Sequence, residues 1–261
     1  MKNKSGTSLE IIPIEGIPDI NPGDSIGKII GESILSQGDF LYDGDIVIIT
    51  QKIISKAEDR FVHSASVIPS ETAKIISVIS QKPPELIELI LQESNSVLRY
   101  NERAVIVEHK LGFVCANAGI DQSNVLREKK GEGDWYLLLP KNPDKSAEQV
   151  RNHLNKIFST QVGVMIIDSH GRAWRYGTVG TAIGISGLPG LVDLRGKPDL
   201  YGRELKITRV GVADELAGAA SLVMGQADEK IPAVIARGFP YKLREAKLQE
   251  VLRSEERDMF R

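Results

Sequence analysis

Two short segments each place an aspartate directly after an apolar run and beside small polar residues. One spans residues 115–124 around Asp121, and the other spans residues 166–172 around Asp168. An aspartate at the end of a buried strand costs desolvation free energy unless a cation or hydrogen-bond donors compensate it. Two such carboxylates can together hold a hard divalent cation, which prefers oxygen ligands. The pattern indicates metal-assisted chemistry on a phosphate, although turn capping or salt bridges would explain the same aspartates.

A lysine and a glycine-containing turn are further candidates for phosphate contact. Lys56 follows a buried apolar run, where its ammonium group could contact a phosphate as a point charge. A single lysine at the end of a strand is, however, more often simply exposed to solvent. The turn at residues 15–18 could bring backbone groups close to a ligand, because glycine permits an approach that a side chain would block. A plain turn is the alternative. The sequence has no Walker phosphate loop and no dinucleotide glycine fingerprint.

Bulk properties limit the class of protein. A chain of 261 residues can form one large domain or two intimately joined ones, and its net charge of -2 gives no sign of a nucleic-acid partner. Its single cysteine, Cys115, excludes an intrachain disulfide and a cysteine-rich zinc site. No apolar run reaches the roughly 18 residues that span a bilayer. Residues 1–8 are polar and lack the apolar region of a signal peptide, so we expect a cytoplasmic protein without a membrane partner.

Strand and helix patterns alternate along the chain, which predicts a mixed α/β fold without repeats or a clean domain boundary. Expected strands cover residues 9–14, 46–49, 104–107, 113–116, 135–139, 162–167, 205–212 and 231–236. Expected helices begin at Asp24 or Ser25, at Ser70 and at Pro83, or cover residues 143–158, 213–225 and 241–261. Residues 177–190 contain too many glycines for a helix interior, which indicates close backbone packing or the approach of a ligand.

Seven strings of sequence resemble those of the coenzyme F420-0:L-glutamate ligase family. They cover residues 13–18, 51–58, 117–124, 168–175, 199–205, 223–228 and 231–234. They occur in the family's order from about residue 9 to 238, which is far more specific than one short motif. We therefore expect a ligase domain over residues 9–240, followed by a charged helix over residues 241–261.

The resemblance implies a fold, an activity and partners. The fold would be an α/β unit of two intimately joined subdomains that intertwines as a homodimer. The activity would be GTP-dependent addition of L-glutamate to the phospholactyl carboxylate of a deazaflavin coenzyme F420 precursor. GTP would phosphorylate that carboxylate, the amine of glutamate would attack the acyl phosphate, and a further turn would add a γ-linked glutamate. The implied ions are Mg²⁺ or Mn²⁺, with K⁺ as an additional cation.

The resemblance also assigns residues to the cation. Asp121 and Asp168 would be the catalytic ligands that hold the ion on the β- and γ-phosphates of GTP. Ser169 would add a hydroxyl where the family more often has threonine, which keeps the oxygen. Gln226 would ligate through its amide oxygen at a position where relatives can carry an acidic side chain.

Binding of GTP is implied by the resemblance rather than by a standard motif. The expected contacts are Glu15, Gly16, Ile17, Pro18, Gln51, Lys52, Lys56, Asn124, Leu222, Val223, Met224, Gly225, Gln226, Ala227, Asp228 and Glu229.

Other residues are weaker candidates. His63, His109, His153 and His170 lack metal-ligand spacing, and His170 is close to the site only by adjacency in sequence. Cys115 has no obvious base partner, so we interpret it as a small buried apolar residue.

Several aromatic and basic side chains each have two possible roles. Trp174 and Tyr201 could stack on an aromatic ring, but core or interface packing is the commoner use. Arg172, Arg175 and Arg203 are candidates for acceptor phosphate or carboxylate groups, with salt bridges equally plausible.

Two alternative functions stay open. One is a ligase of the same chemistry that acts on another carboxylate acceptor. The other is a non-catalytic coenzyme-binding protein on the same fold. The joint presence of Asp121, Asp168, Ser169 and Lys56 argues against the non-catalytic alternative.

Overall fold

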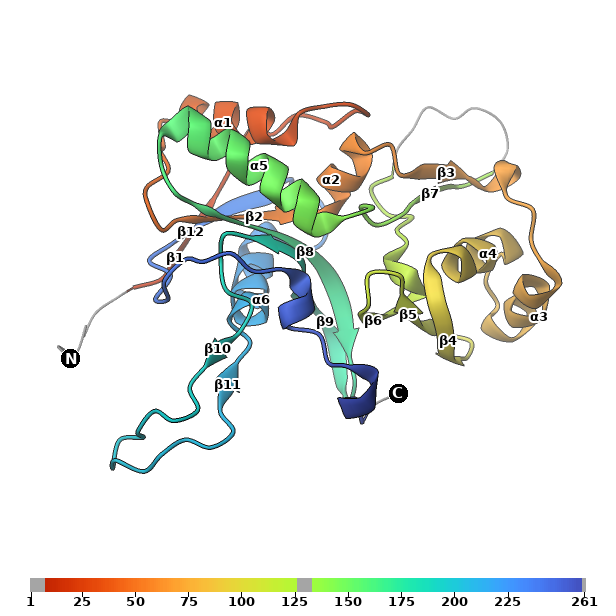
Figure 1. The fold of residues 1–261 in the computed structure, drawn as a ribbon. Helices are drawn as coiled ribbons and strands as arrows, with labels where there is room; N and C mark the ends of the chain where they lie inside the picture. Colours follow the sequence, from red (N-terminus) through yellow and green to blue (C-terminus); the bar gives the residue numbers. More distant parts are fainter. Residues whose placement is uncertain (1–7, 126–132, 260–261) are drawn as a thin grey trace.

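A mixed five-stranded sheet lies at the centre of the larger part of the molecule (Figure 1). The computed structural model describes residues 8–125 and 133–259, so the polar start of the chain lies outside the described residues. The strand order is β1-β12-β2-β8-β9, in which only β2 and β8 are parallel neighbours. The strands are β1 (Glu10–Pro13), β2 (Ile46–Thr50), β8 (Gly163–Arg172), β9 (Arg175–Ser186) and β12 (Ala233–Arg237). The predicted mixed α/β class is confirmed.

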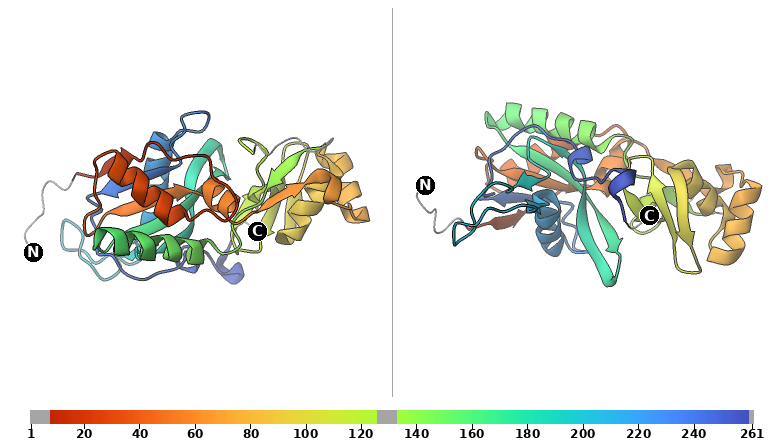
Figure 2. Two further views of the ribbon diagram at one scale, coloured as in Figure 1. Left: turned by 90° about the horizontal axis from the view of Figure 1, so that it is seen from above. Right: turned by 60° about the horizontal axis from the view of Figure 1, so that its bottom comes forward.

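Helices cover both faces of this sheet. α1 (Ile26–Ser36) and α5 (Pro143–Phe158) lie side by side over one face, and α6 (Val212–Met224) lies on the other (Figure 2). Strand β2 is buried because its alternating side chains enter two separate cores. Val47 and Ile49 belong to the core beneath α1 and α5, whereas Ile46 and Ile48 belong to the core beneath α6.

Glycines in β9 allow both helix layers to approach the sheet closely. A Cβ atom on Gly180 would lie 2.3 Å from the carbonyl oxygen of Ala217 in α6. A Cβ atom on Gly184 would lie 2.4 Å from the Cβ of Pro143 in α5. Real Cβ atoms do not reach such distances, so both glycines serve close packing, one of the two roles expected for residues 177–190.

A smaller group of elements, residues 58–140, lies beside the sheet, and we call it the small lobe (Figure 1). The short helix α2 (Gln51–Ala57) leads into it from β2. Its two sheets pair β3 with β7 and join β4, β5 and β6. Its elements are β3 (Phe61–His63), α3 (Glu71–Ser80), α4 (Pro84–Gln92), β4 (Ser94–Tyr100), β5 (Val105–His109), β6 (Val114–Ala116) and β7 (Trp135–Leu137).

The small lobe shares a core with the rest of the molecule, which we call the large lobe. Ile87 and Val107 of the small lobe belong to the same buried cluster as Ile49 and Val164 of the large sheet. The ion pair Arg60–Glu93, at 2.5 Å, fixes the entry to the small lobe. The position of one lobe against the other is therefore set by packing.

The C-terminal segment is not the helix that the sequence predicted. Over residues 241–259 it contains only two short 3₁₀ turns, at Leu248–Glu250 and Glu255–Arg257. Leu248 is buried, and its backbone N–H donates to the Asp144 carboxylate at 3.1 Å. The Glu250 carboxylate accepts from the backbone N–H groups of Gly190 and Leu191. These tertiary contacts hold the segment in an open path, and helix propensity alone does not outweigh them.

The predicted strand over residues 205–212 is also shorter in the structure. Only Arg209–Val210 (β11) pairs with Val192–Asp193 (β10), and the loop between them projects from the large lobe (Figure 1). The loop closes on itself, for example through the bond from Leu205 N to Lys197 O at 2.9 Å. The predicted hairpin of β5 and β6 and the helices α1, α3, α4, α5 and α6 are confirmed.

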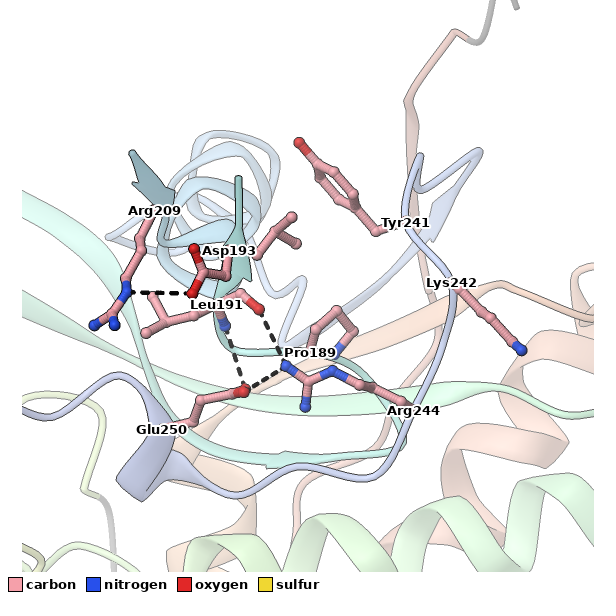
Figure 3. A pocket seen from close by; sticks show the side chains of 9 residues that line it. Pro189, Leu191, Asp193, Arg209, Tyr241, Lys242, Arg244 and Glu250 are labelled. Carbon is pink, nitrogen blue, oxygen red and sulfur yellow. Dashed lines mark hydrogen bonds and ion pairs between the residues drawn. The ribbon is translucent and has the colours of Figure 1, made fainter. Parts of the chain in front are cut away.

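A pocket of about 620 Å³ lies between the β10–β11 pair and the C-terminal segment (Figure 3). Two of its three cationic side chains are paired, Arg209 with Asp193 and Arg244 with Glu250. None of the candidate residues from the sequence lines this pocket. Among the described residues, no helix combines the length and the apolar character that a membrane crossing requires.

Candidate active site

Four segments of the chain meet at one edge of the large sheet. β2 and β8 run parallel with Thr50 opposite Ile167, so both strands reach this edge together. β1 ends at the edge and β12 begins there, since Pro13 pairs with Val234 and Thr50 N donates to Pro232 O at 2.9 Å. Ligands of α/β sheets commonly bind beyond the carboxyl ends of the strands. The edge therefore gathers candidate residues that are distant in sequence.

Asp121 reaches this edge from the small lobe. Its backbone exchanges two hydrogen bonds with Leu137, at 3.0 and 2.9 Å, which fix the loop against β7. Its Oδ2 atom accepts from Gln51 Nε2 at 2.6 Å and from Lys52 Nζ at 2.5 Å. Ser55 Oγ in turn donates to Gln51 Oε1 at 2.8 Å, which fixes the amide of Gln51. The first turn of α2 thus binds a carboxylate of the other lobe.

Neighbouring charges act on the Asp121 carboxyl in opposite senses. Burial is the largest influence and raises its pKa. The Lys52 ammonium lowers the pKa, whereas the negative charge of Asp168 raises it. The net pKa lies above the ordinary value because the protein interior disfavours the charged form. The effect of Asp168 on Asp121, and of Lys52 on both carboxyl groups, indicates that the two aspartates lie in one electrostatic environment.

Asp168 lies where β8 leaves the buried part of the sheet, and its side chain is 12% exposed. Its Oδ2 atom is 3.1 Å from His170 Nε2, an ion-pair distance at which the ring N–H is not aligned as a hydrogen bond. Burial raises the pKa of Asp168, but His170, the Ser169 backbone N–H and Lys52 together lower it further. The net pKa is below the ordinary value, so this carboxylate is ionised at neutral pH.

Two side-chain contacts connect the loop after α6 to the two segments that carry the aspartates. Ser169 Oγ donates to Gln226 Oε1 at 2.8 Å, which joins two of the predicted cation ligands. Asn124 Nδ2 donates to the carbonyl oxygen of Ala227 at 3.3 Å, across the two lobes. The structure therefore places residues 121–124, 168–169 and 226–227 beside one another.

The end of α6 shapes the predicted nucleotide segment at residues 222–229. Leu222 is 85% exposed, whereas Met224 is buried in the core beneath α6 and Val223 packs against it. The side chain of Met224 is thus not available to a ligand. Gly225 has a φ of +73°, and a Cβ atom there would lie 2.1 Å from the Glu229 carboxyl carbon.

Glu229 closes the loop that follows this helix end. Its Oε2 atom accepts from Ala227 N at 2.8 Å. Asp228 lies exposed at the tip of the loop. The loop is therefore a compact turn whose outer face is open to solvent.

Lys56 lies in the last turn of α2, beside Lys52. Burial lowers the pKa of Lys56, Asp19 opposes that effect, and the positive charge of Lys52 lowers it further. Two lysine ammonium groups and one carboxylate thus share this side of the sheet edge. Such a group of lysines suits an anionic ligand whose charge exceeds that of one carboxylate.

The turn after β1 also lies at this edge. Gln37 holds it, because Glu15 N donates to Gln37 Oε1 at 3.0 Å and Gln37 Nε2 donates to Pro13 O at 3.2 Å. Gly16 adopts a φ of +71° and has open space where a Cβ atom would lie. Glu15, Gly16 and Pro18 are exposed, and Ile17 packs against the core. The turn is accessible to a ligand.

Comparison with known proteins identifies the family of this chain. Residues 16–238 match the family model described as F420-0:Gamma-glutamyl ligase. The chain belongs to this family. It is 44% identical over 255 residues to the coenzyme F420:L-glutamate ligase of Methanothermobacter thermautotrophicus, covering 97% of this chain and 99% of that protein. The ligase of that name in Archaeoglobus fulgidus is 42% identical over 253 residues, covering 97% and 96%.

The donor set of this F420-0:gamma-glutamyl ligase family member fits a hard divalent cation. Asp121, Asp168, Ser169 and Gln226 all offer oxygen. Among the described residues, no group of three or more His, Cys, Asp or Glu side chains could hold a metal by itself. Mg²⁺ is commonly bound by one or two carboxylates together with the phosphates of a substrate. The four oxygen donors therefore suit a hard cation whose remaining ligands come from outside the chain.

Two readings from the sequence change with the structure. His170, placed near the site only by sequence adjacency, contacts Asp168 directly. Residues i and i+2 of a strand share a face, and that rule could have identified the contact. Trp174 and Tyr201 are 90% and 91% exposed, so neither packs in the core of this chain. Cys115 is buried as expected, and burial raises the pKa of its thiol to about 12.

Proposed function

We propose that this chain catalyses the GTP-dependent addition of L-glutamate to the phospholactyl carboxylate of a coenzyme F420 precursor. A second turn adds a γ-linked glutamate. Membership of the F420-0:gamma-glutamyl ligase family supports the substrates, and the names of its relatives state coenzyme F420 and L-glutamate. The observation that carries the chemistry is the meeting of Asp121 and Asp168 with Lys52 at one sheet edge.

The reaction begins with activation of a poor electrophile. A carboxylate resists attack by an amine because its leaving group would be an oxide or hydroxide. Transfer of the γ-phosphoryl group of GTP to one carboxylate oxygen forms an acyl phosphate and releases GDP. The amine of glutamate then attacks the acyl carbon, loses a proton and expels inorganic phosphate. The amide bond is thus formed at the expense of one GTP.

Asp121, Asp168, Ser169 and Gln226 would hold a Mg²⁺ or Mn²⁺ ion, which would neutralise charge on the phosphates. The contacts of Asp121 support this choice of ligands. Lys52 and Gln51 occupy one oxygen of Asp121, and this fixes the direction of the other. We further propose that K⁺ acts as an additional cation of the same site.

The residues around the edge would bind GTP. Lys52 and Lys56 would meet its phosphates, because two ammonium groups lie together there. The accessible turn at residues 15–18 and the loop at residues 222–229 flank them, and Asn124 ties that loop to the small lobe. The nucleotide would thus lie across the end of β2, between the two lobes.

Two other functions are distinguished by one assay. Purified chain is incubated with GTP, L-glutamate, Mn²⁺ or Mg²⁺ and the glutamate-free coenzyme, and the products are analysed by mass spectrometry. We expect masses that correspond to one and then two added glutamates, and none with ATP in place of GTP. A chain that binds the coenzyme without adding glutamate would be a binding protein. A chain that hydrolyses GTP only with another carboxylate would be a ligase for that acceptor.

We also propose that the chain forms an intertwined homodimer. Large apolar side chains project from two places on the large lobe. Trp174 and Tyr176 lie at the tip of the β8–β9 hairpin, and Leu200, Tyr201 and Ile207 lie in the β10–β11 loop, all at least 88% exposed. Monomeric proteins rarely expose such groups together. Sedimentation at micromolar concentration should give a dimer, and a folded monomer there would contradict the proposal.

A further inference from the structure

His170 and Asp168 share one face of β8, and the ring nitrogen of His170 faces the aspartate. Residues i and i+2 point to the same side of a strand, whereas Ser169 points to the other side and meets Gln226. His170 Nε2 lies 3.1 Å from Asp168 Oδ2. That nitrogen is shielded from solvent and makes no aligned hydrogen bond within the described part of the chain. The Asp168 carboxylate is therefore the polar group that His170 Nε2 approaches.

The ring of His170 is held from the small lobe. It packs against Phe113, with ring centroids 5.3 Å apart and ring planes inclined at 47°. Phe113 in turn stacks on His109, with centroids 5.3 Å apart and planes at 10°. His109 is buried, and its Nδ1 accepts from Leu111 N at 2.9 Å. Three rings in contact, of which His109 and Phe113 are stacked, thus connect a fixed turn of the small lobe to the carboxylate of the large lobe.

Each aspartate of the proposed cation site is contacted by neighbouring side chains, but different residue types make the contact in each case. Asp121 of the small lobe is held by Gln51 and Lys52 of the large lobe. Asp168 of the large lobe is contacted by His170, whose ring rests on the small lobe. The contacts of Gln51 and Lys52 with Asp121 cross the junction directly, whereas His170 and Asp168 lie on the same strand and the junction is crossed by the ring contact of His170 with Phe113.

We propose that His170, held by Phe113, is the positioning residue that fixes Asp168 for cation binding. The proposal rests on the proposed function only in taking Asp168 as a cation ligand. A carboxylate on a strand end rotates about two side-chain bonds, and the repulsion from Asp121 would turn it away from a shared ion. The contact with His170 Nε2 holds one oxygen and leaves the carboxylate in one orientation. Partners of this kind orient metal ligands in many proteins.

The test measures Mn²⁺ binding to the full chain without nucleotide, by the electron paramagnetic resonance signal of free Mn²⁺. H170A should weaken Mn²⁺ binding about 10- to 100-fold, the usual effect of losing such a partner. H170Q, which keeps an N–H donor, should recover part of the affinity. F113L should cause a smaller loss, because it keeps an apolar side chain but removes the ring contact. Thermal unfolding of each variant is measured in parallel.

A matched control removes a histidine–aromatic contact elsewhere. His63 packs against Trp135 with ring centroids 4.9 Å apart, within the small lobe. H63A should keep the Mn²⁺ affinity of the unchanged chain. Unchanged affinity in H170A, equal affinities in H170A and H170Q, or a wild-type chain that binds no Mn²⁺ would each overturn the proposal.

The outcome is separable from that of the proposed function, because Mn²⁺ binding requires neither the acceptor nor glutamate. A chain that shows the expected order of Mn²⁺ affinities but adds no glutamate would keep this inference and reject the ligase assignment. A chain that adds glutamate while H170A binds Mn²⁺ normally would do the reverse. If the loss in H170A matched its loss of thermal stability, the role would be structural and the proposal wrong.

Discussion

Asp121 and Asp168 reach the junction from different lobes, and their surroundings move their carboxyl pKa values in opposite directions. Burial raises the pKa of Asp121 in spite of Lys52. Burial also raises the pKa of Asp168, but His170, a backbone N–H and Lys52 outweigh it. The difference lies in the donors around each carboxylate rather than in the extent of burial. The same residue type thus has a raised pKa at one position and a lowered pKa at the other, according to the groups that surround it.

The comparison also concerns what holds each lobe in place. In the large lobe, Asp168 belongs to a sheet whose glycines allow helices to pack closely on both faces. In the small lobe, Asp121 is held by its backbone bridge to Leu137 and by contacts with α2. We infer that the geometry of Asp121 is the more sensitive of the two to changes in the opposite lobe.

The largest expected effect follows removal of either charge. D121N or D168N should fold yet lose turnover on the order of 10²–10³-fold, the scale of losing one electrostatic stabiliser of a transition state. The measurement is glutamate addition at saturating GTP. D45N is the matched control, because Asp45 is buried at the other end of β2 and binds Arg237 at 2.9 Å. It should lose stability but keep turnover, and near-normal turnover in both site variants would contradict the assignment.

The second prediction tests the stacked rings through stability. Burial lowers the pKa of His109 from 6.5 to about 4, so the folded chain keeps it neutral where the unfolded chain protonates it. The unfolded state then binds more protons between these values, and stability falls as pH drops through that window. The expected contribution is about 3 kcal/mol, at about 1.4 kcal/mol per pKa unit. Urea unfolding of wild type and H109Q from pH 7 to about 4 should show a flatter dependence in the variant, and parallel curves would refute the buried neutral form.

The third prediction concerns the lysine that holds Asp121. K52M removes the ammonium that lowers the pKa of Asp121, so the acid limb of the pH–rate profile should move to higher pH. Turnover at neutral pH should fall about 10- to 100-fold, the usual range for a partner of a metal ligand. The control is K74M, which loses an exposed pair with Glu71. An acid limb that stays in place would show that Lys52 does not govern the charge of Asp121.

The smallest expected effect concerns the hydroxyl beside Asp168. S169T keeps the oxygen that bonds Gln226, and it should retain most activity. S169A removes the oxygen and should reduce activity about tenfold, the lower end of the range for such groups. Steady-state rates at limiting Mn²⁺ distinguish the two. Equal rates for the two variants would remove Ser169 from the proposed ligand set.

The fold class and the place of Asp168 could be predicted because both depend on local pattern. A short continuous apolar run predicts a buried strand, and the polar residue after it falls at the sheet edge. The contact between Gln51 and Asp121 joins residues 70 apart and depends on how the small lobe packs, which no local pattern records. The predicted helix over residues 241–261 failed for a related reason. Asp144, Gly190 and Leu191 anchor that segment residue by residue.

The central claim is that a carboxylate of the acceptor is phosphorylated by GTP before glutamate attacks it. It is tested most directly by labelling both oxygens of the acceptor carboxylate with oxygen-18 and analysing the released phosphate. One labelled oxygen should appear in each phosphate, with the other retained in the amide. D168N, which should form far less acyl phosphate in the same time, gives the background. Amide formed without transfer of label to phosphate would contradict the acyl-phosphate route.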